Sequence, residues 1–471
     1  KEQEAIWNAI QNTEGHVFVN AGAGTGKTFT IVEGANRVQD KDCAFLAFNK
    51  SIATELAKKL PENVEAKTFH AFGFAAIRNA GIRTKVNNYK VTNIIKEVLG
   101  ADYYVTPLKK LVSLVKGAMV EGNNVTAIRG LIDEYNIQFQ SEREEQQAIQ
   151  IMPTILQMCQ TQTHLIDFDD MVWMPIVNNY PLPHYDIMFV DEAQDFNEVQ
   201  RELISRCVNG GRCIIVGDKN QAIYGFRGAD SNSIGMFEKR LKNGSREISH
   251  FPLTTTWRCP KSVVSEANRY VADYHAHDDA PEGNVIVRAA FTPLRNDMVL
   301  CRYNAPLVSA FYDLISQGKS AYILGRDMTA GLVNAVKKIT SNNNMGTEEF
   351  WQLFMTDFEF NHAKLISQDK VNQALALEDK KECIAIFTDK ATTVGGIISE
   401  IKRVFDNNDE GEIMLSTVHK AKGLEADNVY ILATDRMPHP KGGSEENNIC
   451  YVAITRAKKN LFYVGPKPEV N

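Results

Sequence analysis

The amino-acid sequence predicts an α/β fold with parallel sheets, and three observations point to it. Six short apolar segments are each followed by a polar or glycine-rich turn and then by helical sequence. Most are continuous apolar runs, which is typical of strands whose sheet is covered by helices on both faces. The composition, with 44% hydrophobic and 23% charged residues, is that of a globular protein with a large core. In order, the predicted strands with their turns span 16–21, 43–49, 185–195, 212–218, 297–304 and 428–435.

Two stretches interrupt this alternation of strands and helices. Residues 74–165 contain no clear buried strand and include amphipathic, Gln/Glu-rich sequence at 139–152, which predicts an inserted helical subdomain. A second, mostly helical stretch is predicted at 331–410, with polar runs at 340–344 and 406–411. The strand patterns before Ser249 and after Phe251 are compatible with two similar sheets.

Length, charge and cysteine content exclude several classes of protein. The 471 residues exceed one ordinary domain, and roughly three are expected at this length. A formal charge of -6 excludes a uniformly basic wrapper of nucleic acid, but not a local basic channel. No apolar run approaches the ~18 residues of a membrane span, so neither insertion nor secretion is predicted, although a segment ahead of Lys1 would be invisible. The eight cysteines form no C-x-x-C pair, which predicts reduced thiols in a cytosolic protein and no zinc site.

A glycine-rich loop between a predicted strand and a predicted helix is the first candidate site. Small residues let backbone N–H groups close around a phosphate, while a lysine adds positive charge and a threonine hydroxyl can bind Mg²⁺. The generic phosphate-binding loop has a glycine where this chain has Ala21. The predicted nucleotide-binding residues of the loop are Ala21, Gly22, Ala23, Gly24, Thr25, Gly26, Lys27 and Thr28.

An acidic pair after another apolar strand supplies what hydrolysis of a nucleoside triphosphate also requires. Asp191 is predicted to hold the metal together with Thr28, and Glu192 to orient or deprotonate the attacking water. An acidic pair alone is a weak signal, since helix N-termini favour carboxylates. Combined with Lys27, the pair predicts a Mg²⁺-dependent nucleoside triphosphatase.

Longer motifs resemble those of the UvrD/Rep-like superfamily 1 DNA helicases. The sequences at 191–195 (DEAQD) and 216–229 (VGDKNQAIYGFRGA) are similar to motifs II and III of that family. Further matches follow in family order over nearly the whole chain, and the segment at 46–50 is closer to the F-box DNA helicase branch, although no F-box is identified. The further matches are Gln3, 48–50, 68–70, 167–170, 257–258, 417–425 and 451–457.

The resemblance implies two RecA-like domains, each with a mainly helical insertion. The first domain (1A) would comprise residues 1–73 and 166–250, with its insertion (1B) at 74–165. The second domain (2A) would comprise residues 251–330 and 411–471, with its insertion (2B) at 331–410. This second insertion is much shorter than that of the bacterial members, so regulation by a rotating 2B arm is not expected.

The resemblance also assigns roles around the nucleotide. Gln3 matches the glutamine that reads adenine, and Trp257 stands where the family has a tyrosine that stacks on the base. Gln221 would sense the γ-phosphate, while Arg258 and Arg456 match two arginines that stabilise charge on the transferring phosphoryl group. Because these arginines fall in the second half of the chain, a complete site requires both halves. Gly423 and Glu425 join the nucleotide-binding set, with Glu425 matching the acidic residue that contacts the ribose.

On the nucleic-acid side, the resemblance implies aromatic platforms and backbone contacts. Phe226 replaces the commoner tryptophan, and Phe48 is displaced by one position, so it is expected in the core. A core position is an alternative for Phe69 and Phe226 as well. The predicted strand-binding residues are Asn49, Lys50, Thr68, Phe69, His70, Tyr224, Phe226, Arg227, Thr417, His419 and Lys420.

The sequence therefore predicts an ATP-dependent DNA helicase that moves 3' to 5' on single-stranded DNA and acts at single/double-strand junctions. It is expected to act as a monomer in the cytoplasm, or in the nucleus of a eukaryote, without a membrane and with replication or repair proteins as partners. A translocase that displaces bound proteins with little unwinding is one alternative. A nucleotide-gated DNA-binding protein is another, and RNA remains open because stacking and phosphate contacts separate DNA from RNA poorly.

Overall fold

The computed structural model divides into two compact units, which are described separately. Unit 1 comprises Lys1–Thr254 and unit 2 comprises Thr255–Asn471. The predicted limits at 73/74 and 330/331 fall inside helices, and the limit at 250/251 falls inside a strand. The structure describes residues 1–38, 40–47, 50–100, 105–135, 137, 139, 141–208, 210–223, 232–242, 244, 246–368, 370–405, 411–439 and 444–470.

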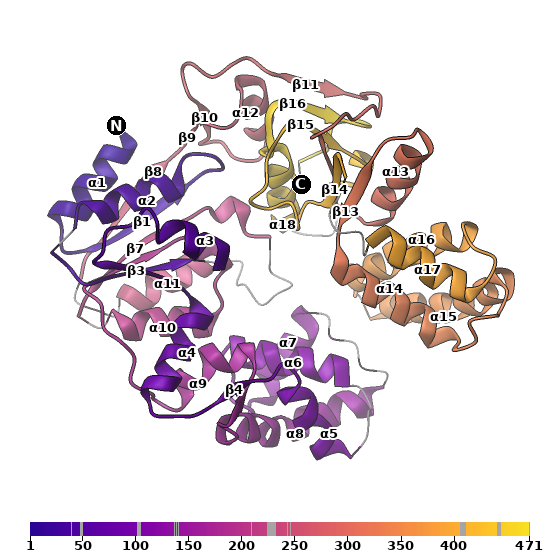
Figure 1. Ribbon diagram of the computed structural model, residues 1–471, viewed down its shortest axis with the longest axis horizontal. Coiled ribbons are helices and arrows are strands. Elements are labelled where there is room, and N and C mark those ends of the chain that lie inside the picture. Colours follow the sequence, from indigo (N-terminus) through magenta and orange to yellow (C-terminus); the bar gives the residue numbers. More distant parts are fainter. Residues whose placement is uncertain are drawn as a thin grey trace. The chain divides into compact units, whose positions relative to one another are not determined.

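Unit 1 contains a six-stranded parallel sheet in the order β3-β2-β6-β7-β1-β8 (Figure 1). Successive residues of its strands enter cores on opposite faces: Val17 and Val19 belong to one cluster and Phe18 to the other. Helices therefore cover both faces, which is why the inner strands are apolar throughout. The strands are β1 (His16–Ala21), β2 (Cys43–Ala47), β3 (Val64–Thr68), β6 (Ile187–Val190), β7 (Arg212–Gly217) and β8 (Ile248–Leu253).

The helices of unit 1 fall into a set around the sheet and a helical segment beyond it. The helices around the sheet are α1 (Glu2–Asn12), α2 (Lys27–Asn36), α3 (Lys50–Leu56), α4 (Phe69–Asn79), α9 (Phe168–Val177), α10 (Glu198–Cys207) and α11 (Ser233–Lys242). The helical segment contains α5 (Lys90–Leu99), α6 (Val105–Gly117), α7 (Val125–Glu134) and α8 (Glu142–Thr161), with a small sheet of β4 (Lys85–Val86) and β5 (Leu165–Ile166) at its base.

A buried charge cluster fastens the helical segment to α9. Asp170 accepts hydrogen bonds from Lys90 Nζ at 2.7 Å and from Lys116 Nζ at 2.8 Å, and all three side chains are almost fully buried. Asp167 and Asp170 also form the capping box at the start of α9. Burial alone would lower the pKa of Lys116, but the neighbouring Asp170 carboxylate outweighs it and the net shift is upward. The Lys116 ammonium therefore remains charged, and the hydrogen bonds of Lys90 and Lys116 to Asp170 hold α5 and α6 against α9.

Unit 2 repeats the same architecture, with a six-stranded parallel sheet in the order β11-β16-β15-β12-β14-β13. The α/β fold with two parallel sheets, predicted from the sequence, is thus confirmed. The strands are β11 (Asn284–Val287), β12 (Met298–Cys301), β13 (Ala321–Leu324), β14 (Ile413–Thr417), β15 (Ala426–Ile431) and β16 (Ala457–Tyr463), and a separate pair is formed by β9 (Thr255–Thr256) and β10 (His275–Ala276).

The helices of unit 2 include four consecutive ones between β13 and β14. These are α14 (Arg326–Ile339), α15 (Thr347–Ser367), α16 (Val371–Asp389) and α17 (Val394–Phe405). The remaining α-helices are α12 (Lys261–Ala267), α13 (Ala305–Ser316) and α18 (Ser444–Ile454).

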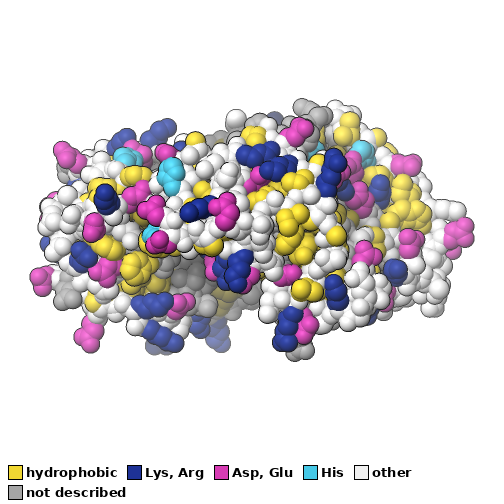
Figure 2. Space-filling model, turned by 90° about the horizontal axis from the view of Figure 1, so that it is seen from above, with side chains coloured by type: hydrophobic (Ala, Val, Ile, Leu, Met, Phe, Trp, Pro, Cys, Tyr) yellow, Lys and Arg dark blue, Asp and Glu magenta, His cyan; other side chains and the backbone are white. Residues whose placement is uncertain are grey.

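The surface charges, the cysteines and the helix lengths can be compared with the predictions from composition. On the face shown in Figure 2, basic and acidic side chains are interspersed, in keeping with the near balance of charges. All eight cysteines are buried free thiols. Within the described part of the chain, no helix combines the length and apolar character that crossing a membrane requires.

Candidate functional site

The phosphate-binding loop connects β1 to α2 at the carboxyl edge of the unit 1 sheet. Gly24 and Gly26 have φ of 67° and 83°, a left-handed conformation that side chains with a Cβ rarely adopt. The Thr25 hydroxyl donates to the Gly22 carbonyl at 3.0 Å and stiffens the turn. Ala21, Ala23 and Thr25 are buried. The loop therefore leads into the positive N-terminal end of α2, a suitable place for an anion.

The acidic pair lies beside this loop because β6 and β1 run parallel on either side of β7. The Thr28 hydroxyl donates to Asp191 Oδ2 at 2.9 Å, and Lys27 Nζ lies 3.5 Å from Glu192 Oε1. The structure thus brings together four predicted residues, although the two members of each pair are more than 160 positions apart in the sequence. A hydroxyl and a carboxylate are hard oxygen ligands of the kind that Mg²⁺ prefers, so these residues fit the predicted metal.

The Asp191 carboxyl is held in an unfavourable environment. Burial, together with the negative charge of Glu192, raises the pKa of Asp191 to about 6. A divalent cation would relieve this cost, since it favours the ionised form of its ligand.

We expect Asp191→Asn to stabilise the metal-free protein at neutral pH. Because the pKa of this carboxyl is about 6 rather than 3.8, the folded state binds more protons than the unfolded state in this window and loses stability as the pH rises through it. At about 1.4 kcal/mol per pKa unit, the gain at pH 7.5 is on the order of 2 kcal/mol, falling to nothing near pH 4. Urea unfolding in a chelating buffer measures it, with Asp133→Asn on α7 as the control. A variant less stable than the parent protein at pH 7.5 would contradict the expectation.

A third strand end completes this half of the site. Gln221 lies in the short helix η2 (Lys219–Gln221) after β7, and its Nε2 donates to Asp218 Oδ2 at 2.7 Å. Gln194, in the short helix η1 (Ala193–Asp195), bonds Glu192 through its Nε2 at 2.5 Å. The sequence analysis did not anticipate this contact of Gln194 with Glu192, because nothing in the DEAQD motif indicates where the glutamine side chain points.

The N-terminal helix, α1, supplies Gln3, the remaining predicted nucleotide-binding residue of unit 1. Gln3 Nε2 donates to the Thr30 hydroxyl at 3.0 Å, beside the phosphate-binding loop. Phe29, which the sequence analysis did not single out, is 61% exposed on the first turn of α2 and meets the Trp7 ring edge-on at 6.3 Å.

The two predicted arginines lie close to one another within unit 2. Arg258 Nε pairs with Glu425 at 2.5 Å and its Nη1 donates to the Thr455 carbonyl at 3.4 Å. Arg456 is 1% exposed and donates to the carbonyls of Val452 and Leu424 at 2.9 and 3.1 Å. Burial, followed by repulsion from Arg258, lowers the pKa of Arg456 to about 10. This positive pair is suited to an anion, but only Arg258 is partly exposed.

Two further predicted nucleotide residues lie in the same unit. Trp257 is 62% exposed, and the centre of its ring lies 3.8 Å from that of His277, so one of its faces is covered. Gly423 adopts a φ of 87° in the turn after β14, two residues before the exposed Glu425.

The predicted strand-binding residues of unit 1 differ in whether their side chains are exposed. Lys50 is exposed at the start of α3, and the Thr68 hydroxyl caps α4 by accepting from the Ala71 N–H at 3.2 Å. Phe69 is a correction: its ring is 4% exposed and packs edge-on against Phe196 at 4.9 Å, so no face remains for a base. Of the residues considered for strand binding in the sequence analysis, five lie outside the described ranges: Phe48, Asn49, Tyr224, Phe226 and Arg227.

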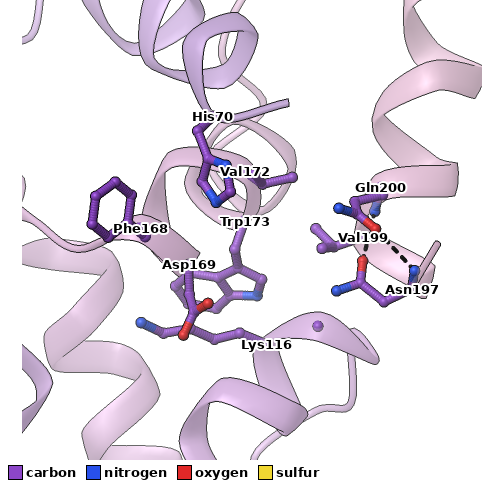
Figure 3. Close-up of a pocket in the computed structure, with 10 residues that line it drawn as sticks. His70, Lys116, Phe168, Asp169, Val172, Trp173, Asn197, Val199 and Gln200 are labelled. Carbon is purple, nitrogen blue, oxygen red and sulfur yellow. Dashed lines mark hydrogen bonds between the residues drawn. The ribbon is translucent and has the colours of Figure 1, made fainter. Parts of the chain in front are cut away.

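His70 is exposed and borders a small pocket between α4, α6, α9 and α10 (Figure 3). Its ring meets that of Phe168 edge-on at 5.6 Å, and Phe168 itself is 51% exposed. Lys116 and Trp173 form the other side of the pocket, with the ammonium 5.5 Å from the ring centre. Phe168 is a third residue that the sequence reasoning did not single out, although it lies in the matched motif at 167–170.

In unit 2, the predicted strand-binding residues follow β14. Thr417 ends the strand, and its carbonyl accepts from the N–H groups of Lys420 and Ala421 at 3.1 and 3.0 Å. His419 and Lys420 are half-buried in this turn.

The parallel sheet, the phosphate-binding loop and the lysine, threonine and acidic pair beside it define a P-loop nucleoside triphosphatase. Comparison with family models identifies its kind. Residues 2–242 match the UvrD/REP helicase N-terminal domain and residues 313–465 match the UvrD-like helicase C-terminal domain. The chain therefore belongs to the UvrD/Rep-like superfamily 1 DNA helicases, a family of ATP-hydrolysing enzymes with two RecA-like domains.

Individual relatives are distant. F-box DNA helicase protein 1 of Schizosaccharomyces pombe is 24% identical, over 98% of this chain and 57% of its own length. The ATP-dependent DNA helicase PcrA of Staphylococcus aureus is 22% identical, over 96% of this chain and 82% of its own length. PcrA of Leuconostoc citreum is 24% identical, over 56% of this chain and 38% of its own length. The chain spans between 38% and 57% of three of the curated relatives that it matches.

A solved structure of an arterivirus nonstructural protein 10 helicase with DNA covers 98% of this chain and 62% of its own. With 11% identity and a TM-score of 0.36, this similarity is too weak to support a conclusion about either protein.

Proposed function

We propose that this chain is an ATP- and Mg²⁺-dependent DNA helicase that steps 3' to 5' along single-stranded DNA and unwinds duplexes. The observation that carries the proposal is the joining of Thr28 to Asp191 and of Lys27 to Glu192 at one sheet edge. Membership of the helicase family supports DNA as the substrate. The direction of movement rests on the resemblance of the motifs alone.

Each residue of the ATP site has a proposed task. Lys27 and the loop N–H groups bind the phosphates, and Thr28 and Asp191 hold Mg²⁺, which neutralises phosphate charge when bound. Glu192 orients the attacking water and accepts its proton. Gln221 contacts the γ-phosphate, and Arg258 and Arg456 stabilise the charge that develops on it. Gln3, Trp257, Gly423 and Glu425 bind the adenosine part of ATP.

Phe168 and His70 are proposed to contact the strand together with the residues predicted from the motifs, with the exception of the buried Phe69. Phe168 offers an exposed ring above a pocket lined by polar side chains, the combination that stacks on a base without reading it. Lys50, Thr68, Thr417, His419 and Lys420 are proposed to contact the phosphate backbone.

Phe168→Ala is expected to weaken binding of single-stranded DNA by about 5- to 150-fold, since stacking on an aromatic ring is worth about 1–3 kcal/mol per base. The KM for ATP without DNA should not change. Fluorescence anisotropy with a labelled oligonucleotide measures the Kd. Phe360→Ala removes another exposed ring, 71% exposed on α15, and is the matched control. Equal affinity in the Phe168 variant and the parent protein would remove Phe168 from the interface.

The test of the proposed function combines two assays on the parent protein. ATP hydrolysis is measured with and without single-stranded DNA or RNA, and strand displacement is measured on duplexes with a 3' or a 5' tail. Strong stimulation by DNA and unwinding from the 3' tail alone are expected. Stimulation without unwinding would favour a translocase that displaces bound proteins, stimulation by RNA alone would change the substrate, and no stimulation would favour a nucleotide-gated binding protein.

The wider assignments are part of the same proposal. The two helical segments correspond to insertions 1B and 2B, and the protein acts as a monomer at single/double-strand junctions. Replication or repair proteins are its proposed partners, in the cytoplasm or, in a eukaryote, the nucleus.

A further inference from the structure

The side chain of Gln194 joins two separate segments of unit 1. It is 2% exposed and lies in η1, directly after the acidic pair. Its Nε2 donates to Glu192 Oε2 at 2.5 Å, and its Oε1 accepts from the Asp218 N–H at 3.0 Å. A glutamine can form both bonds because its amide has a donor end and an acceptor end. Methionine provides neither, and ionised glutamate provides only the acceptor.

The segment bonded to the other end of the Gln194 amide comes directly before the predicted strand-binding residues Tyr224, Phe226 and Arg227 in the sequence. The Asp218 carboxylate accepts from Gln221 Nε2 at 2.7 Å and from the Asn220 N–H at 3.0 Å. Gln221 stands three residues before Tyr224 in the sequence. A continuous chain of hydrogen bonds thus runs from Glu192 through Gln194 and Asp218 to Gln221.

The backbone around Gln194 is shaped for this contact. A Cβ on Gly217 would lie 2.8 Å from Gln194 Oε1, so the amide can approach β7 only because residue 217 is glycine. Glu192 has a φ of 55°, a left-handed conformation that is strained for a side chain of this size. Its N–H donates to Asp191 Oδ1 at 2.8 Å, which helps to hold that conformation. The position of the Glu192 carboxylate is therefore determined by its neighbours.

We propose that Gln194 is a positioning residue that makes ATP hydrolysis depend on strand binding. It does not touch the nucleotide. A strand bound at the predicted residues Tyr224, Phe226 and Arg227 shifts the segment at 218–221, which precedes them in the sequence, and Gln194 transmits that shift to the carboxylate that activates water. This inference rests on the proposed function, because it requires a hydrolase that single-stranded DNA stimulates.

Substitution of Gln194 tests its bonds, with kcat and KM for ATP measured with and without saturating single-stranded DNA. Gln194→Met is expected to reduce the stimulation by DNA about 10- to 100-fold, as expected for the loss of a hydrogen bond to a charged group. The KM for ATP and the Kd for DNA should stay unchanged, a separation that general damage to the fold would not give.

Controls separate this inference from the proposed function. Gln160→Met makes the same chemical change at a half-buried glutamine whose amide donates to the Val177 carbonyl, and its stimulation should be normal. Gly217→Ala displaces Gln194 without changing its chemistry and should reproduce the loss, which keeps the test valid if Gln194→Met does not fold. Full stimulation in folded Gln194→Met overturns the role of Gln194 and leaves the helicase proposal intact. A parent protein that DNA does not stimulate overturns both.

Discussion

Lys27→Ala is expected to abolish ATP hydrolysis, by a factor of about 10³ or more, while single-stranded DNA still binds. The ammonium group lies 3.5 Å from the Glu192 carboxylate, at the N-terminal end of α2 where the phosphates of ATP are proposed to bind. Its charge is the main compensation for phosphate charge that develops in a largely desolvated site. Alanine leaves the loop intact, so the loss falls on catalysis and on nucleotide affinity. Phosphate release at saturating DNA measures it.

The matched control is Lys59→Ala. This lysine is exposed and pairs with Glu55 four residues before it, so its loss should change neither hydrolysis nor DNA binding. Turnover stimulated by DNA that persisted in Lys27→Ala would rule out the phosphate-binding loop as the catalytic site. Loss of both activities together with a lower Tm would point to unfolding instead.

Arg258→Ala is expected to lower kcat by about 10³ with a much smaller change in the KM for ATP, because the guanidinium acts mainly on charge that appears in the transition state. Arg258 is the better of the two arginines to change. Replacing the buried Arg456 would also remove its hydrogen bonds to the carbonyls of Leu424 and Val452 and would destabilise the fold, although the Thr455 hydroxyl still donates to Val452. Single-turnover hydrolysis separates the chemical step from product release.

Two companion variants define the meaning of that result. Arg295→Ala removes a largely exposed arginine of unit 2 and should have no effect. Glu425→Gln keeps Arg258 but removes its counter-charge, so kcat should be preserved while the KM rises if Glu425 contacts the ribose. An Arg258 variant that loses affinity for ATP at unchanged kcat would show that the residue binds nucleotide without stabilising the transition state.

The inner strands of the unit 1 sheet could be predicted, whereas its edge strands could not. β1, β2, β6 and β7 are buried on both faces and appear in the sequence as apolar runs. β3 and β8 lie at the edges of this sheet and mix polar with apolar residues, so their sequences do not stand out. Of the inner strands of unit 2, β12 and β15 were predicted, but the short β14, which ends in Ser and Thr, and β16, which two lysines interrupt, were not.

The ATP site was predictable because its residues lie in contiguous motifs with fixed chemical roles. Thr28 and Asp191 met as expected, since the carboxyl ends of all strands in a parallel sheet lie at one edge, and only β7 separates β1 from β6. A motif does not say where a side chain points, which is why Phe69 was assigned to the strand although it is buried. The reverse holds for Phe168, whose exposure depends on its place at the start of a helix.

The cluster formed by Lys90, Lys116 and Asp170 limits how this protein can be shortened. Two of its charges belong to the helical segment, while Asp170 belongs to α9, which packs beside the sheet. Deleting the segment would leave a carboxylate in the core without either of its cations, at a cost of about 3–5 kcal/mol. A minimal version of unit 1 would therefore need an apolar or amide residue at position 170 as well. The segment is an integral part of the folded unit, and not a module that can be removed independently.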